Sequence, residues 1–228
     1  MLKRAALIAV LSMFCATAAF AAQADNTQPF YGGGERTPAQ LQADKVFIEE
    51  LTKKAGSREA AAKNVLLRGW ELLKSGDAAT AMKRFNQAWL LTPNDSDVLW
   101  GFAAAQCNLG KFDVGLPLFE RANSQMPGNG ALLSDYAYAY ISKAATIDDT
   151  PAQREVSFGR ALSLLNQAEA LQPANPMIHS NRAIVRFFQG RYAEAWQGVE
   201  KAEKLAPGSV DQRFLRDLSA KMPRPQAK

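Results

Sequence analysis

A spacing of 34 residues recurs along this 228-residue chain, and it constrains the fold more than any other feature of the sequence. Identical residues at this spacing include Gly76 and Gly110, Phe85 and Phe119, Pro93 and Pro127, Ala161 and Ala195, and Pro173 and Pro207. A period of this length is that of a helix–turn–helix unit, which covers its apolar face only by stacking on a neighbouring unit. The sequence therefore predicts an all-α solenoid of stacked helical hairpins.

Four units, within residues 57–208, agree at the positions that helix packing selects. Each unit has a small residue in its first helix, a bulky residue in its second helix and a closing proline: Gly69, Ala103, Ala137 and Ala183; Phe85, Phe119, Leu165 and Val199; and Pro93, Pro127, Pro173 and Pro207. Small residues let two helices approach closely, and proline ends a helix. In this pattern the chain resembles the tetratricopeptide-repeat (TPR) family, and in particular its exported bacterial members, from about Lys63 to Pro207. The resemblance implies a right-handed α-solenoid that binds other proteins.

The third unit is longer than the others. Pro127 and Pro173 lie 46 residues apart, which is the repeat of 34 plus 12 residues. We place this insertion near residues 142–157. Thr150 and Pro151 combine a helix-capping residue with a proline suited to the first helical position, so we expect a long helix to begin there.

Segments on both sides of the repeats are expected to extend and cap the solenoid. Residues 22–36 contain three consecutive glycines and predict a flexible leader. Residues 37–56 predict an additional N-terminal helix. Residues 209–221 predict a helix that covers the last apolar face of the stack, and residues 222–228, with two prolines, predict a disordered tail.

The first 21 residues have the pattern of a signal peptide. Lys3 and Arg4 precede an apolar run, which ends at the small-x-small sequence that signal peptidase reads, so we predict cleavage after Ala21. Export, to the periplasm, follows from this pattern. One alternative is that the segment remains as an uncleaved membrane anchor. Another is a lipoprotein attached through Cys15, although Phe14 stands where the lipoprotein pattern has a small residue.

The chain offers little for catalysis or for holding a cofactor. His179 is its single histidine, and Cys107 is the single cysteine after cleavage, so we expect no zinc site and no internal disulfide. The acidic pair at 148–149 precedes an expected helix start, where negative charge suits the helix dipole. Cleavage leaves a net charge of 25 − 22 = +3, spread along the chain, which argues against nucleic-acid binding. We expect no enzyme activity, no cofactor and no metal.

Function is therefore expected on the face that first helices line in this family. The resemblance places an apolar, aromatic partner groove at Leu66, Trp70, Leu73, Trp100, Asn108, Tyr138, Ile141, Ile184, Phe187 and Phe188. Aromatic anchors in a groove suit a helix or an extended segment of another protein. The alternatives are that the chain fills this groove itself, with the helix expected at 37–56, or that tight superhelical winding buries these side chains.

The sequence thus predicts a non-enzymatic protein-binding adaptor or scaffold of the bacterial envelope. A pilus or secretion assembly factor, or an adaptor of an envelope protease, is the alternative within that class. A self-associating structural module and a carboxylate-dependent hydrolase are the alternatives outside it. The sequence does not identify the partner protein or the oligomeric state.

Overall fold

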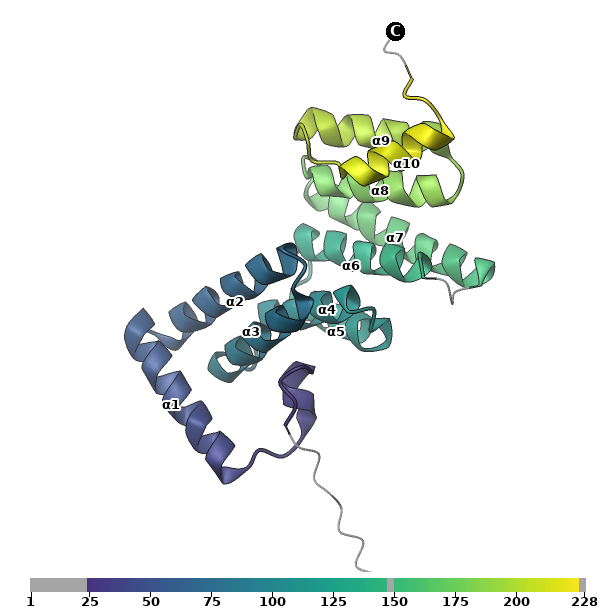
Figure 1. Ribbon diagram of the computed structural model, residues 1–228. Coiled ribbons are helices and arrows are strands. Elements are labelled where there is room, and N and C mark those ends of the chain that lie inside the picture. The colour runs from purple at the N-terminus through teal and green to yellow at the C-terminus, as the bar shows by residue number, and fades with distance from the viewer. Residues whose placement is uncertain (1–23, 147–149, 226–228) are drawn as a thin grey trace, which may run out of the picture.

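The computed structural model describes residues 24–146 and 150–225, and these residues form ten α-helices, one 3-10 turn and no strand. The elements are η1 (Pro29–Gly33), α1 (Pro38–Ala55), α2 (Arg58–Lys74), α3 (Ala78–Leu91), α4 (Ser96–Asn108), α5 (Phe112–Gln125), α6 (Gly130–Ala144), α7 (Pro151–Leu171), α8 (Pro176–Phe188), α9 (Tyr192–Leu205) and α10 (Gln212–Lys221). Four hairpins, α2–α3, α4–α5, α6–α7 and α8–α9, stack one after another, and α2, α4, α6 and α8 each contact the next (Figure 1). The expected all-α repeat solenoid is confirmed.

Close packing around bulky side chains explains why small residues recur in the sequence. Phe85 of α3 is completely buried, with Gly69 of α2 and Gly101 of α4 against its ring. A Cβ atom on either glycine would lie 2.5 or 2.6 Å from a ring carbon of Phe85. Because no real Cβ comes so close, an alanine would force the helices apart, and overpacking of this kind costs about 1–3 kcal/mol.

The additional residues of the third hairpin lie in its connection and in an extended second helix. α7 has 21 residues, against 14 in each of α3, α5 and α9. The helix begins with a capping box, in which the Gln153 backbone N–H donates to Thr150 Oγ1 and the Thr150 N–H donates to Gln153 Oε1. The acidic pair at 148–149 lies outside the described residues.

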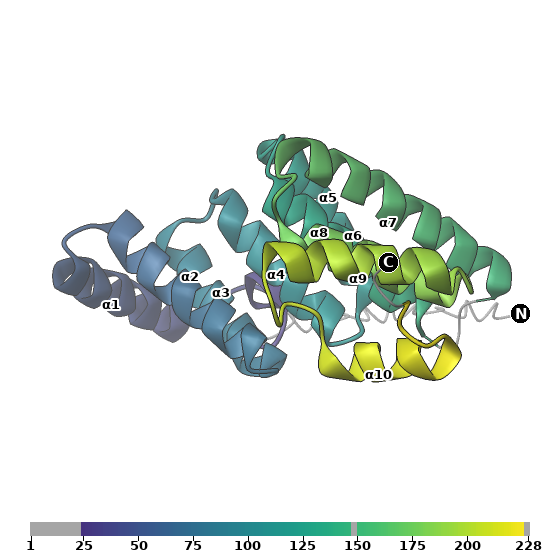
Figure 2. The same cartoon turned by 90° about the horizontal axis from the view of Figure 1, so that it is seen from above.

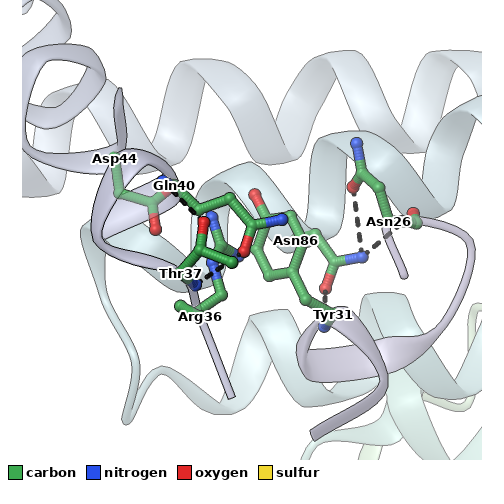
Figure 3. A network of polar contacts seen from close by, with 7 residues as sticks. All are labelled: Asn26, Tyr31, Arg36, Thr37, Gln40, Asp44 and Asn86. Carbon is green, nitrogen blue, oxygen red and sulfur yellow. Dashed lines mark hydrogen bonds and ion pairs between the residues drawn. The ribbon is translucent and has the colours of Figure 1, made fainter. Parts of the chain in front are cut away.

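The described part of the expected flexible leader is folded, which corrects that prediction. Residues 25–33, called the hook below, close on themselves through the Asp25 N–H, which donates to the Tyr31 carbonyl at 2.8 Å. Asn86, completely buried in α3, holds the hook (Figure 3): its Oδ1 accepts from the Tyr31 N–H at 3.1 Å, and its Nδ2 donates to the backbone oxygens of Gln28 (2.8 Å) and Asn26 (3.1 Å).

The hook keeps an unfavourable backbone conformation because its side chains pack on the repeats. Phe30 and Tyr31 have φ of 56° and 55°, in the left-handed region, which costs about 1–2 kcal/mol for each residue. The Phe30 ring packs edge-on against Phe102 at 4.8 Å and against Trp89 at 5.8 Å, between ring centroids. Gly32 and Gly33 continue this left-handed turn, with φ of 78° and 68°. Here glycine permits one fixed conformation and does not indicate flexibility.

The two ends of the stack are covered by α1 and α10, which lie at opposite ends of the molecule in Figure 1 and far apart in Figure 2. α1 has no buried residue; Phe47, Ile48 and Leu51 pack against the outer side of the first hairpin. An ion pair between Arg36 and Asp44 joins α1 to the segment that follows the hook (Figure 3).

At the C-terminal end, α10 closes the stack with Leu218, which is completely buried. Met222, the first residue of the tail expected to be disordered, is held in place: its carbonyl accepts a hydrogen bond of 3.0 Å from Trp196 Nε1. None of the helices described is both long enough and apolar enough to cross a membrane. The expected signal peptide lies outside the described residues.

Candidate binding groove

A groove of about 770 Å³ opens along the first helices of the first three hairpins. It is lined by Trp70, Leu73 and Lys74 of α2, Ala104, Cys107 and Asn108 of α4, Asp135, Tyr138, Ala139 and Ser142 of α6, Gly110, Phe112 and Phe119, Thr146, and Met177 of α8. We call this the central groove. The lining residues of α2, α4 and α6 follow the pattern i, i+3, i+4, extended to i+7 in α6, which is the spacing of one helical face.

Aromatic side chains form much of the groove wall. Trp70 packs edge-on against Trp100 and Phe85, with ring centroids 5.0 and 5.4 Å apart. Phe119, deep in the wall, is stacked on Tyr136 at 5.1 Å. Tyr138 is 47% exposed, which is high for so large a ring. The groove therefore combines rigid aromatic walls with an apolar ring available to a ligand.

One carboxylate, Asp135, lies among these apolar groups. The side chain is partly buried, and its Oδ2 accepts a hydrogen bond of 3.1 Å from Trp100 Nε1. Burial raises the pKa of Asp135 from 3.8 to about 6, because the desolvated carboxylate loses its hydration; the Trp100 bond opposes this effect. Lys74, exposed on α2, is the only cationic residue among the described residues that line the groove.

The cysteine of the groove is a packing residue. Cys107 is a free thiol with 7% of its surface exposed, and burial raises its pKa to about 12. It is protonated at neutral pH and is therefore a poor nucleophile. A Cβ atom on Gly115 would lie 2.4 Å from its Sγ, which shows how closely α4 and α5 pack here.

The structure separates the residues that the sequence assigned to one groove. Trp70, Leu73, Asn108 and Tyr138 line the central groove, and Trp100 lies behind Trp70 and contacts Asp135. Leu66 and Ile141, expected in the groove, are instead buried between helices, with 7% and 2% exposure. These two positions are corrected: their side chains lie on the faces that α2 and α6 turn to the core.

The predicted residues of the fourth unit lie elsewhere. Ile184 packs with the core around Phe158, and Phe187 forms an aromatic cluster with Phe188, Tyr192 and Phe214, with centroids 5.6–5.8 Å apart. Phe188 also stacks on Phe158 at 5.8 Å. Of α8, Met177 alone lines the central groove. The sequence thus placed on one surface two sets of residues that the structure keeps apart.

The sequence missed Asp135, Phe112, Phe119 and Thr146 as groove residues. A signal for Asp135 existed, because it precedes Tyr138 by three residues and Ser142 by seven, and so shares their helical face. Its neighbour Ser134, one position earlier, is 2% exposed and does not line the groove. Phe119 was recognised only as a core residue, and the structure shows that it serves both roles.

The described N-terminal residues, 24–55, do not fill the groove. Neither α1 nor the hook contributes to its lining, since α1 packs on the outside of the first hairpin and the hook packs on α3. The alternative of internal occupation by the helix of residues 37–56 is therefore corrected for the described residues.

The described residues contain no group of three or more His, Cys, Asp or Glu side chains placed to hold a metal ion. His179 is buried, with its Nε2 3.2 Å from the Pro173 carbonyl oxygen. Its environment is that of a packed side chain that satisfies a backbone group.

No protein-family model matches the chain, and no curated protein matches it significantly. A thermophilic TPR protein of Thermus thermophilus is similar in structure, with a TM-score of 0.62, 23% identity, and coverage of 72% of this chain and 84% of that protein. The protein MamA (AMB-1) superposes with a TM-score of 0.45 and 17% identity, over 77% of this chain and 98% of MamA. The chain thus has the fold of a TPR-like solenoid.

Proposed function

We propose that this protein is a non-enzymatic adaptor that holds an apolar segment of a partner protein in the central groove. The observation that carries the proposal is an open groove of about 770 Å³ with the exposed Tyr138 ring on its surface. An apolar, aromatic groove of this kind suits a segment that buries a few large side chains. Aromatic anchors also lose little side-chain entropy on binding, because Trp70 and its neighbours are already held by ring contacts.

The proposal places the protein in the bacterial envelope, exported by the signal peptide expected at residues 1–21. Within that setting, a role in pilus or secretion assembly, or in delivering substrates to an envelope protease, requires the same groove. The carboxylate-dependent hydrolase receives less support, because such chemistry uses a pair of carboxyl groups and Asp135 is the single carboxylate among the described residues that line the groove.

A site-specific photo-crosslinker tests the groove directly. Benzoyl-phenylalanine is introduced at Tyr138 or, as a matched control, at Leu171 of α7, since the two side chains are 47% and 48% exposed. On irradiation of cells that produce the protein, we expect covalent adducts at position 138 and none at 171. Trp70→Ala should reduce the adducts at 138. An absence of adducts at 138, or equal labelling at both positions, would contradict the proposal.

A further inference from the structure

We infer that the segment bound in the central groove presents a cationic side chain, arginine or lysine, between apolar residues, and that Asp135 receives this cation. The inference rests on the proposed function and names the chemistry of its partner. It follows from the position of one carboxylate in an apolar groove and from the groups that surround it.

Asp135 lacks a counter-ion among the described residues. It forms no ion pair there, and its hydrogen bond comes from the neutral indole of Trp100. A desolvated carboxylate without a paired cation is costly to keep ionised. Burial accordingly raises its pKa to about 6, yet it remains mostly ionised at neutral pH. A cation supplied by a partner would compensate for this desolvation.

The geometry leaves the carboxylate available to the partner. Trp100 Nε1 donates to Oδ2 and so fixes the orientation of the group, while Oδ1 accepts no hydrogen bond from any described residue. The Trp100 ring is itself held by Trp70, at 5.0 Å between centroids. Because the acceptor is oriented before binding, the partner does not have to order it.

The aromatic side chains nearby suit the rest of a cationic side chain. Tyr138 follows Asp135 by three residues on the same face of α6, and Trp70 of α2, which also lines the groove, packs against the Trp100 ring that donates to Asp135. Guanidinium and ammonium groups bind favourably over aromatic faces, and their alkyl stems pack on apolar surface. The groove thus offers both a charge partner and a surface for the stem.

The other titratable groups that the described residues place in the groove leave room for one cationic side chain of the partner, next to Asp135. Lys74 from α2 carries the same charge as the proposed ligand and disfavours a second cation near it. Cys107 from α4 is a neutral thiol, and Met177 from α8 is uncharged. We therefore expect one arginine or lysine with apolar residues on both sides, and not a run of basic residues.

Three peptide libraries provide the test. Each holds short peptides with random apolar flanks and one fixed central residue, which is arginine, its neutral isostere citrulline, or glutamate. Peptides are first selected by retention on the immobilised full-length protein. The affinities of the retained peptides from the three libraries are then compared by fluorescence polarisation. We expect the arginine peptides to bind about tenfold more tightly than the citrulline peptides, with glutamate the weakest, since a charge-assisted bond in a poorly hydrated groove is strong.

Asp135→Asn should abolish the preference for arginine over citrulline, because an asparagine oxygen can still accept from Trp100 Nε1 but carries no charge. Glu200→Gln, on the exposed surface of α9, is the matched control and should keep the preference. Equal binding of the three libraries, or a preference that survives in Asp135→Asn, would overturn the inference and leave the proposed function intact. Retention of none of the libraries would contradict the proposed function and, with it, the inference.

Discussion

The ionised Asp135 side chain should lower the free energy of unfolding at neutral pH. Replacing it by asparagine should therefore stabilise the protein. In the folded state the pKa of Asp135 is raised from 3.8 to about 6 by burial. Each unit of difference between the folded and unfolded pKa is worth about 1.4 kcal/mol. The ionised carboxylate therefore lowers the free energy of unfolding by about 3 kcal/mol, an upper figure because the side chain keeps some contact with water.

The sign of this effect fixes its pH dependence. Between about pH 4 and pH 6 the folded state binds the proton of Asp135 more tightly than the unfolded state does. The stabilisation from this group is present in acid and is lost as the pH rises through 6. Asp135→Asn, which cannot ionise, should therefore match the parent protein at about pH 4 and exceed it at about pH 7.5.

Urea denaturation followed by far-ultraviolet circular dichroism measures the free energy of unfolding of Asp135→Asn and of the parent protein at each of these two pH values. Glu200→Gln controls for the loss of one negative charge, because Glu200 is exposed and the net charge changes equally. We expect a gain of about 1–3 kcal/mol for Asp135→Asn at neutral pH and none for the control. A variant no more stable than the parent at neutral pH, or a gain of equal size at both pH values, would refute this reasoning.

Three further results follow from the packing of the chain. Phe119→Ala should lower the free energy of unfolding by about 3–5 kcal/mol, whereas Phe188→Ala, which truncates a side chain 49% exposed, should cost much less; urea denaturation compares them. Asn86→Ala should release the hook, so that its amides exchange hydrogen faster by mass spectrometry, while Asn64→Ala on the exposed face of α2 should not. Intact-mass measurement of exported protein should give a chain beginning after Ala21, and a mass matching all 228 residues would contradict cleavage there.

The repeat architecture was predictable because its determinants are local and recur. Proline at a fixed position ends each second helix, and small residues at fixed positions permit the crossings around side chains such as Phe85. The start of α7 was equally visible, since Thr150 and Pro151 carry a helix-start signal that depends only on neighbours in the chain.

The groove was only partly predictable, because the side of a helix facing a groove depends on how neighbouring helices rotate about their axes. On α6, a difference of one residue separates Asp135, which lines the groove, from Ser134, which is buried. Sequence periodicity identifies the apolar stripe of a helix. It does not show where that stripe ends when neighbouring helices pack on both sides of the helix. In the fourth hairpin the same uncertainty placed Phe187 in the groove, whereas it packs against Phe214 of α10.

The hook was not predictable from local sequence, because its conformation depends on a residue about 55 positions away. Three glycines normally indicate flexibility, and nothing beside them in the chain shows that Asn86 would satisfy the Tyr31 N–H. A buried asparagine inside α3 was the available signal. Such a side chain requires hydrogen-bond partners, and a helix supplies none at its own surface.

The hook, α1 and the central groove together show how the chain distributes its apolar surface. The hook packs Phe30 onto the second helix of the first hairpin, and α1 covers the outer end of that hairpin. Both therefore cover surface on the outside of the stack, where apolar side chains would otherwise meet water. No other described residues cover the groove between the first helices in this way, and it is also where an ionisable side chain stands among aromatic rings. The described residues thus cover the outer surface of the stack and leave its inner groove open at a cost in stability, as the proposed binding of a partner segment requires.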